Sequence, residues 1–170
     1  MHKAIAAAAA TMFVVAGCAS MSAKEYRATT TLEPTTGNQA SGTVTFVQRG
    51  NSVHVVADLR GLTPNAEHGF HVHEKGDCSS GDGMSAGDHF NPQGVGHGRD
   101  PGHAGDMPNL KADAKGNAKT AFDTSKMTVS EGKSSIVAKG LIVHKDPDDY
   151  KTQPAGNAGA RVACGVIKST

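Results

Sequence analysis

The sequence lacks tryptophan and has few other aromatic residues, with two tyrosines and five phenylalanines among 170 residues. It also lacks an excess of either charge, because the formal net charge is +1 at pH 7. Nucleic-acid-binding domains rely on a basic surface to contact phosphates, so the composition argues against a nucleic-acid partner. Glycine is abundant instead, and 21 glycines without a collagen-like period indicate one domain with many turns.

Helical periodicity is also missing, and the only long apolar run lies at the N-terminus. Elsewhere short segments alternate apolar and polar residues between turn residues such as Gly-Asn and Thr-Pro-Asn, a pattern typical of β-hairpins. Eight short strands of this kind predict an all-β fold, a sandwich or a flattened barrel. The predicted strands cover residues 26–32, 42–47, 53–59, 69–73, 119–122, 135–138, 141–144 and 161–167.

Two long stretches interrupt the strands, at residues 74–109 and 145–160. The first stretch is dense in glycine, proline, aspartate and histidine. Long loops without secondary structure are uncommon inside a compact domain and usually carry function. We expect a disulfide or a metal ion to hold these loops in place, since the chain offers residues for both.

The N-terminus resembles an export signal. Residues 1–3 are a short positive start, and residues 4–15 form an apolar run that is too short to span a bilayer as a helix. Residues 15–18 (VAGC) resemble a bacterial lipobox, in which a lipidated Cys18 becomes the mature N-terminus. An ordinary secretory signal that is cleaved nearby is the alternative. Both interpretations predict export.

The lipoprotein interpretation divides the chain into a signal peptide at residues 1–17, a tether at residues 18–25 and one domain at residues 26–170. It predicts a periplasmic protein that a lipid anchors to a membrane. Ala19 and Ser20, which follow the lipobox, lack the aspartate that often retains lipoproteins in an inner membrane. The outer membrane is therefore the expected location.

Cysteine is scarce, with residues only at positions 18, 78 and 164. An odd cysteine in an exported protein needs an explanation. If Cys18 carries lipid, Cys78 and Cys164 remain as one pair in an oxidising compartment, where a disulfide is the expected outcome. Two buried free thiols are the alternative.

Histidine carries the candidate chemistry, with nine residues in the chain. His71 and His73 stand two apart on a predicted strand, so both imidazoles point to the same face. Such a pair is half of a transition-metal site. His144 ends another predicted strand and is placed to reach the pair. A set of imidazoles without thiolate suits Cu(II).

The first long loop adds further candidate ligands, namely His89, His97, His103 and Asp106. Three imidazoles and one carboxylate suit tetrahedral zinc. The alternative is a polar surface loop that happens to be rich in histidine. The remaining histidines suggest no ligand: His2 lies in the signal, His54 is interpreted as a surface residue and His68 as a structural one.

Three segments resemble the signature sequences of copper/zinc superoxide dismutases. They are residues 69–74 (GFHVHE), 85–92 (SAGDHFNP) and 156–166 (GNAGARVACGV). The resemblance covers residues 27–168, and the glycine-rich segment at residues 79–84 is similar to that of bacterial members. It implies an eight-stranded Greek-key β-barrel with two long functional loops, and one copper ion and one zinc ion per subunit.

The resemblance also implies a role for each candidate residue. Copper would bind His71, His73, His89 and His144, and zinc would bind His89, His97, His103 and Asp106. His89 would therefore bridge the two metals. Cys78 and Cys164 would form a disulfide, and Arg161 would attract the anionic substrate. Asp148 would orient ligands of both metals from outside their coordination spheres, although Asp146 and Asp149 stand close by.

The implied activity is the disproportionation of superoxide to dioxygen and hydrogen peroxide, with His89 and Arg161 as catalytic residues. A non-catalytic periplasmic copper/zinc-binding protein with the same fold is the alternative, and a lipoprotein whose zinc merely holds a loop is a third hypothesis. A homodimer is one of the assemblies that the resemblance allows. Ala155 and Ala160 stand where eukaryotic members often carry hydroxyl residues, so the anion-steering loop and the dimer surface are expected to differ.

Overall fold

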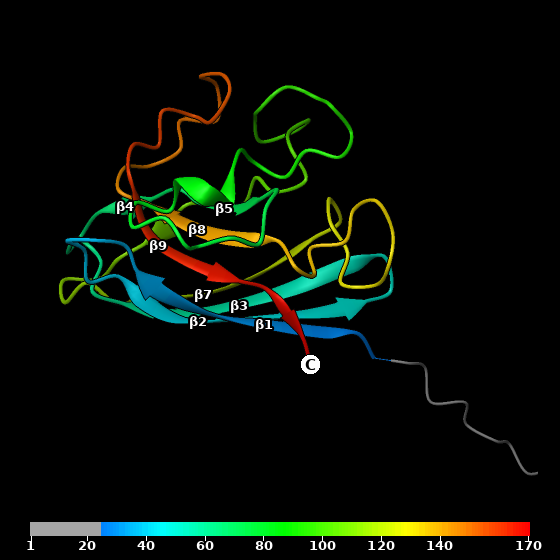
Figure 1. Cartoon of the computed structure of the whole chain (residues 1–170), viewed down its shortest axis with the longest axis horizontal. Helices are drawn as coiled ribbons and strands as arrows, with labels where there is room; N and C mark the ends of the chain where they lie inside the picture. The colour runs from blue at the N-terminus through cyan, green and yellow to red at the C-terminus, as the bar shows by residue number, and fades with distance from the viewer. Residues whose placement is uncertain (1–24) are drawn as a thin grey trace, which may run out of the picture.

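The computed structural model describes residues 25–170 (Figure 1). Buried and exposed side chains alternate along its first three strands. Strands β1 (Arg27–Pro34), β2 (Ser41–Arg49) and β3 (Ser52–Arg60) pair as an antiparallel meander. Along β3 every second side chain enters the apolar core. The predicted signal peptide, Cys18 and most of the predicted tether lie outside the described residues.

The main sheet continues beyond this meander in the order β5-β8-β9-β1-β2-β3-β7, with every pairing antiparallel. The added strands are β5 (Phe70–His73), β7 (Ala118–Thr124), β8 (Gly140–His144) and β9 (Arg161–Val166). Because β3 leads to β5 at the far edge and β7 returns beside β3, the connections are crossovers of the Greek-key type. The sheet curls so that β5, β8 and β9 lie over β1, β2, β3 and β7 (Figure 1).

The remaining elements are short. Strands β4 (Glu67–His68) and β6 (Leu110–Lys111) pair with each other, and β10 (Lys168–Ser169) pairs with β1. One turn of 3-10 helix, η1 (Met84–Ala86), is the only helical element of residues 25–170. Within the same residues, no helix is long and apolar enough to cross a membrane.

The all-β prediction and seven of its eight strands are confirmed, whereas the strand predicted at residues 135–138 is wrong. Ser135 forms only an isolated bridge with Thr128, and residues 137–138 form a turn. In this turn the Lys139 N–H donates to the Ile136 carbonyl at 3.1 Å, and Ala138 has a φ of 62°. The segment resembles a strand because Ile136 is fully buried in the core. The two-residue strands were too short for the alternation pattern to predict them.

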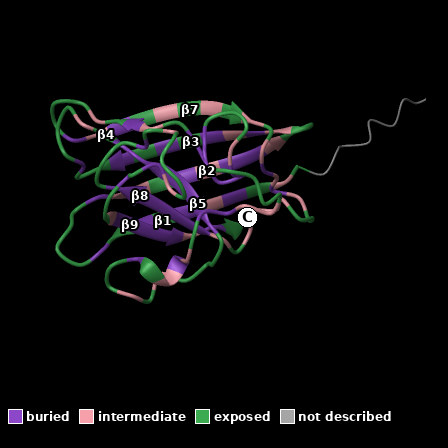
Figure 2. Ribbon diagram, turned by 90° about the horizontal axis from the view of Figure 1, so that it is seen from above, coloured by how far each residue is buried: buried purple, intermediate pink, exposed green. Residues whose placement is uncertain are grey.

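The layer formed by β5 and β8 is buried on both faces (Figure 2). Phe70 and Val72 of β5 belong to the apolar core, so His71 and His73 lie on the opposite face. Residues 74–109 and 145–160 contain no strand and lie over that outer face, as the green and orange loops of Figure 1 show. The two long loops predicted from the sequence therefore cover the histidine side of the sheet.

Candidate metal centre

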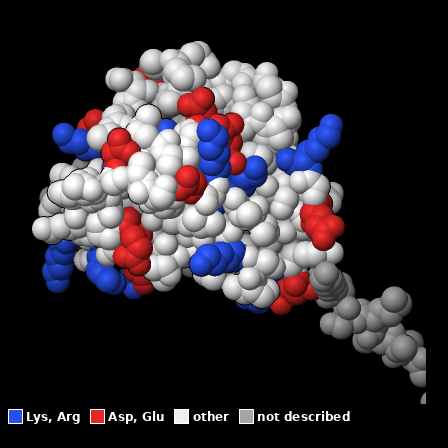
Figure 3. All heavy atoms as spheres, in the orientation of Figure 1, with Lys and Arg blue, Asp and Glu red and all other residues white. Residues whose placement is uncertain are grey.

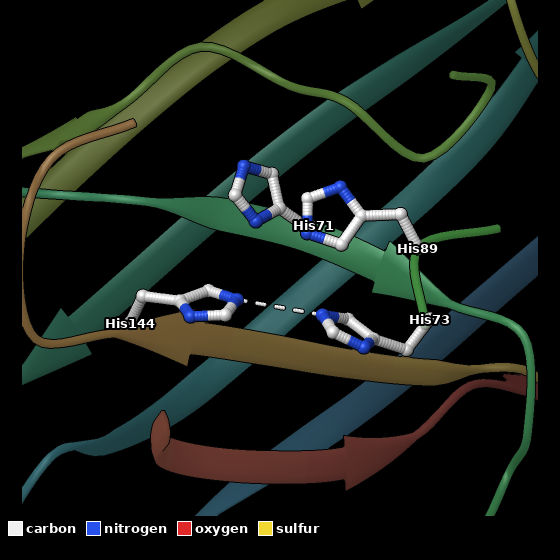
Figure 4. Close-up of side chains that lie close together, drawn as sticks. All are labelled: His71, His73, His89 and His144. Atoms are coloured by element: carbon white, nitrogen blue, oxygen red, sulfur yellow. Dashed lines mark hydrogen bonds between the residues drawn. The ribbon is translucent and has the colours of Figure 1, made fainter. Parts of the chain in front are cut away.

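The first group of histidines is built on β5 and β8. The His144 backbone N–H donates to the Gly69 carbonyl at 2.8 Å, which fixes the end of β8 beside the start of β5. The Nε2 atoms of His73 and His144 lie 3.4 Å apart (Figure 4). From the first loop, the His89 ring approaches to 4.1 Å from the His71 ring, measured between centroids. One possible ligand atom from each of the four residues lies within 4.8 Å of the other three.

The second group comes from the first loop alone. His89, His97, His103 and Asp106 again place one ligand atom each within 4.8 Å of the others. The loop is attached to β5 by backbone hydrogen bonds, from Phe90 N–H to the Val72 carbonyl at 2.8 Å and from Val72 N–H to the Gly105 carbonyl at 3.0 Å. His89 belongs to both groups, so one imidazole joins them.

Each imidazole of the first group has one nitrogen that the protein holds and one that it leaves available. His73 Nδ1 is 2.9 Å from the Gly87 carbonyl and His144 Nδ1 is 3.2 Å from the Gly159 carbonyl, so both residues offer Nε2. His71 is the reverse: its Nε2 is hydrogen-bonded and its buried Nδ1 has no partner. Buried polar atoms without partners are rare because they cost free energy. A Cu(II) ion, which favours several imidazole nitrogens, fits this arrangement.

The second group also contains buried imidazole nitrogens that form no hydrogen bond. His97 Nδ1 and His103 Nδ1 are buried and form none, although Asp106 oxygens lie 2.9 Å and 3.4 Å away. His89 Nδ1 lies 2.8 Å from the Asp106 Oδ1 atom. Three nitrogens that converge on one carboxylate in this way fit a tetrahedral zinc ion.

Burial favours the neutral form of the three strand imidazoles, His71, His73 and His144. It lowers the pKa of His71 and of His73 well below the usual value, with a further contribution from the neighbouring histidines. Burial likewise lowers the pKa of His144 to about 4. For Asp106 burial acts to raise the pKa, but hydrogen bonds from His89 and from a backbone N–H outweigh it and lower the pKa to about 2. Neutral imidazoles and an ionised carboxylate are the forms that bind metal ions.

Asp148 forms hydrogen bonds with one histidine of each group. Its buried carboxylate accepts from His71 Nε2 through Oδ2 and from His97 Nε2 through Oδ1, both at 2.9 Å. The neighbouring candidates Asp146 and Asp149 are exposed. Gly156 leaves the space for this contact, because a Cβ atom there would overlap both Asp148 and His97. Asp148 therefore lies where a residue that orients ligands of both groups is expected.

Arg161 begins β9 and lies beside the first group. Its guanidinium donates to the Gly83 carbonyl at 2.8 Å and to the Gly87 carbonyl at 2.7 Å, on either side of η1. The predicted disulfide between Cys78 and Cys164 is confirmed, with Cα atoms 5.8 Å apart. It packs against η1 and β8. The disulfide thus joins the loop that holds the guanidinium to the strand that carries it.

A hollow of about 310 Å³ opens over the first group. Its lining includes His73, His89, His103, His144 and Arg161, together with Glu74, Asp88, Asn91, Pro154 and Ala155. The sequence analysis did not single out Glu74 and Asp88. The available signal was their place in the chain, since each stands next to a predicted copper ligand. The hollow gives small molecules access to the histidines and to one positive charge.

The structure thus brings together all the predicted ligand residues, in the two groups that the sequence predicts. The other described histidines lie apart from them. His54 forms a pair with Asp123 at 3.0 Å on the outer face of β3. His68 is buried, and its Nδ1 lies 2.8 Å from the His144 carbonyl. These positions agree with the interpretation of His54 as a surface residue and of His68 as a structural residue.

Comparison with known proteins identifies the family. Residues 40–167 match the family model described as copper/zinc superoxide dismutase. A copper–zinc superoxide dismutase of Aquifex aeolicus is 42% identical over 140 residues, which cover 78% of this chain and 82% of that protein. An extracellular copper–zinc superoxide dismutase of Drosophila melanogaster is 41% identical over 140 residues, or 76% of each chain. The crystal structure of an SOD-like protein from Bacillus subtilis is 33% identical with a TM-score of 0.75, and the match covers 81% of this chain and 96% of that one. The chain belongs to the copper/zinc superoxide dismutase family.

Proposed function

We propose that this protein is a superoxide dismutase, an oxidoreductase that converts two superoxide ions and two protons into dioxygen and hydrogen peroxide. The position of His89 carries the proposal. This residue belongs to both ligand groups, with Nδ1 2.8 Å from Asp106 and with a buried Nε2 that has no partner. A histidine shared in this way would connect a redox-active metal to a structural one.

The first group would hold one copper ion and the second one zinc ion, because their donor sets suit these metals. When bound, copper supplies the one-electron chemistry by changing between Cu(II) and Cu(I). The protein contributes the orientation of the ligands. Asp148 accepts from His71 and His97 and so fixes which nitrogen each ring offers.

Arg161 would attract the substrate. Its guanidinium remains charged and lines the hollow, while two backbone carbonyls hold it in place. A positive group in a narrow site raises the local concentration of a small anion. A protein that only stored metal would have no need of this residue beside the hollow.

His89 would also handle a proton. Superoxide that accepts an electron must leave as hydrogen peroxide and therefore needs two protons. His89 lines the hollow, and its Nε2 is not engaged by any other group of residues 25–170. When His89 Nε2 is not bound to copper, it can carry a proton and donate it to the leaving peroxide, which is general acid catalysis.

The test is the consumption of superoxide by the mature protein loaded with copper and zinc. Arg161→Ala should keep both metals but lower the rate at low ionic strength, by a factor of about 10, and make it less sensitive to salt. Arg49→Ala, at the exposed end of β2, is the matched control and should change neither property. An unchanged rate for Arg161→Ala would contradict the anion-guiding role, and a rate equal to that of free copper would contradict the enzyme.

We also propose that the protein is exported, with residues 1–17 as a signal peptide, a lipid on Cys18, a tether at residues 18–25 and the folded domain at residues 26–170. The Cys78–Cys164 disulfide supports an oxidising compartment such as the periplasm. Attachment to the outer membrane follows from the residues after Cys18. Cys18→Ser should release the protein from membrane fractions, and unchanged partitioning would contradict the anchor.

Two further proposals concern partners. The protein forms the homodimer that the family resemblance allows, and it has no nucleic-acid partner. Lysine and arginine alternate with aspartate and glutamate over the face shown in Figure 3, so this face offers no basic footprint for phosphates. Sedimentation of the Cys18→Ser protein tests the assembly. Twice the monomer mass is expected, and the mass of a monomer at micromolar concentration would contradict the dimer.

A further inference from the structure

Two acidic residues flank the backbone carbonyls that hold Arg161. Asp82 precedes Gly83, and Asp88 follows Gly87, so each carbonyl has a carboxylate beside it along the chain. Burial lowers the pKa of the Arg161 guanidinium, and the charges of Asp88 and Asp82 act in the opposite direction. Both carboxylates are therefore close enough to act on the charge that would attract superoxide.

Three carboxylates lie near Arg161 or its hollow, namely Asp82, Asp88 and Glu74. Only Asp88 both lines the hollow over the first ligand group and lacks another interaction within residues 25–170. Asp82 lines a separate surface hollow, and its Oδ1 accepts from the Met84 N–H at 2.9 Å. Glu74 lines the same hollow as Asp88 but lies 3.8 Å from the Lys75 ammonium group. The exposed Asp88 side chain forms no hydrogen bond or ion pair within residues 25–170. Its charge is thus not needed to hold the loop.

We propose that Asp88 is a specificity-determining residue that filters anions by their charge. This inference rests on the proposed function, because it concerns the substrate of that same hollow. The repulsion between a fixed carboxylate and an anion is proportional to the charge of the anion. Asp88 therefore hinders a monoanion such as superoxide slightly, and it hinders a dianion twice as strongly in free energy. The formal net charge of the whole chain is only +1, and acidic and basic side chains are mixed on the face in Figure 3, so we expect local charges to outweigh an overall field.

The filter is useful because Arg161 alone does not discriminate between anions in this way. A guanidinium binds oxyanions such as sulfate and phosphate in a bidentate manner, and such ions would compete with superoxide. A carboxylate next to His89 reduces this competition at a modest cost in substrate attraction. The structure offers Asp88 for that purpose, since it shares the hollow with Arg161.

The test compares the anion affinities of the copper- and zinc-loaded protein and of Asp88→Asn. Azide serves as the monoanion, measured by its effect on the visible absorbance, and sulfate as the dianion, measured by competition with azide. Asp88→Asn should raise the azide affinity about two- to fivefold at low ionic strength, within the range for one exposed charge. It should raise the sulfate affinity by about the square of that factor. Both ratios should approach one at high salt.

Glu131→Gln is the matched control, since it removes one exposed carboxylate outside the hollow and should leave both affinities unchanged. Equal factors for azide and sulfate would overturn the proposal, because they would indicate altered shape rather than charge. Unchanged affinities would overturn it as well. The rate of superoxide consumption is recorded separately, so that an inactive wild-type protein would contradict the proposed function while the two affinities still decide on the filter.

Discussion

The two ligand groups are built from different kinds of structure. Three members of the first group, His71, His73 and His144, stand on β5 and β8, which are paired strands buried on both faces. The members that belong only to the second group, His97, His103 and Asp106, all stand on the loop that follows β5. His89 belongs to both. The sheet therefore fixes the proposed copper side of the site, whereas the proposed zinc side depends on a loop.

This difference predicts different consequences of metal binding. Strand residues keep their relative positions through the hydrogen bonds of the sheet, whether or not a metal is present. A long loop has no such ladder, so an ion that joins its ends replaces the missing secondary structure. We expect copper to add chemistry and zinc to add stability.

Removal of a single ligand should give the largest effects. His144→Ala should lower superoxide consumption by more than about 100-fold, the upper end for residues that only support a ligand, while zinc content and stability change little. His103→Ala should bind less zinc and be less stable than His144→Ala. His54→Ala, which lies apart from both groups, is the control. Equal losses of zinc in the two ligand variants would contradict the distinction between strand and loop.

Selective removal of each metal should give the next largest effect. An ion present at about 1,000 times its dissociation constant stabilises the folded state by about 4 kcal/mol, or about 10 °C in Tm for a domain of this size. Zinc removal should lower Tm by at least this much and speed amide exchange in residues 89–106. Copper removal should lower Tm less and speed amide exchange less than zinc removal does. Calorimetry with hydrogen exchange measures both, and a larger loss of Tm without copper would reverse the comparison.

Asp148→Asn should affect both groups to an intermediate degree. The asparagine keeps the shape but not the charge that accepts from His71 and His97. Loss of such a partner lowers metal affinity by about 10- to 100-fold. Both metals should weaken, as titration with a competing chelator would show. Asp149→Asn, at an exposed neighbour, should bind both as the wild type does. A loss confined to one metal would indicate that Asp148 supports only one group.

The smallest predicted effect is the pH dependence of the metal-free protein. The folded-state pKa values of His71 and His73 lie well below the unfolded value of about 6.5, and that of His144 is about 4. As the pH falls below about 6.5, the unfolded chain binds protons that the folded chain excludes, so stability is lost. The expected slope is about 1.4 kcal/mol per pH unit for each excluded proton.

Denaturant unfolding at several pH values would measure this slope. His144→Gln should reduce the slope by about one proton, whereas His103→Gln should reduce it less, because His103 is less deeply buried than His144. A stability that does not change between pH 7 and pH 4 would contradict the neutral state of the strand histidines.

The parts of the site that depend on short-range patterns could be predicted from the sequence. His71 and His73 share a face because strands alternate, and the fully buried β5 confirms their place. Motif order then pointed to His89, His144 and Arg161. The segment at residues 135–138 was predicted wrongly for the same reason, since one buried isoleucine and β-favouring neighbours imitate alternation in a turn.

The features that sequence reasoning missed depend on contacts between distant residues. The carbonyls of Gly83 and Gly87 hold Arg161, but a backbone oxygen has no signature in the sequence. The resemblance pointed to Asp148, but only the folded loop shows that its carboxylate accepts from His71 and His97. Its neighbours Asp146 and Asp149 are exposed. Asp88 became visible only when its side chain was found in the same hollow as Arg161.

The most direct test of the shared histidine is the binding of both metals to His89→Ala. Copper and zinc affinities are measured separately by chelator competition, with the wild type as reference. Because His89 belongs to both ligand groups, both affinities should fall by more than about 100-fold. If either metal binds as tightly as to the wild type, His89 belongs to one site only, and the account of a joined copper and zinc centre is wrong.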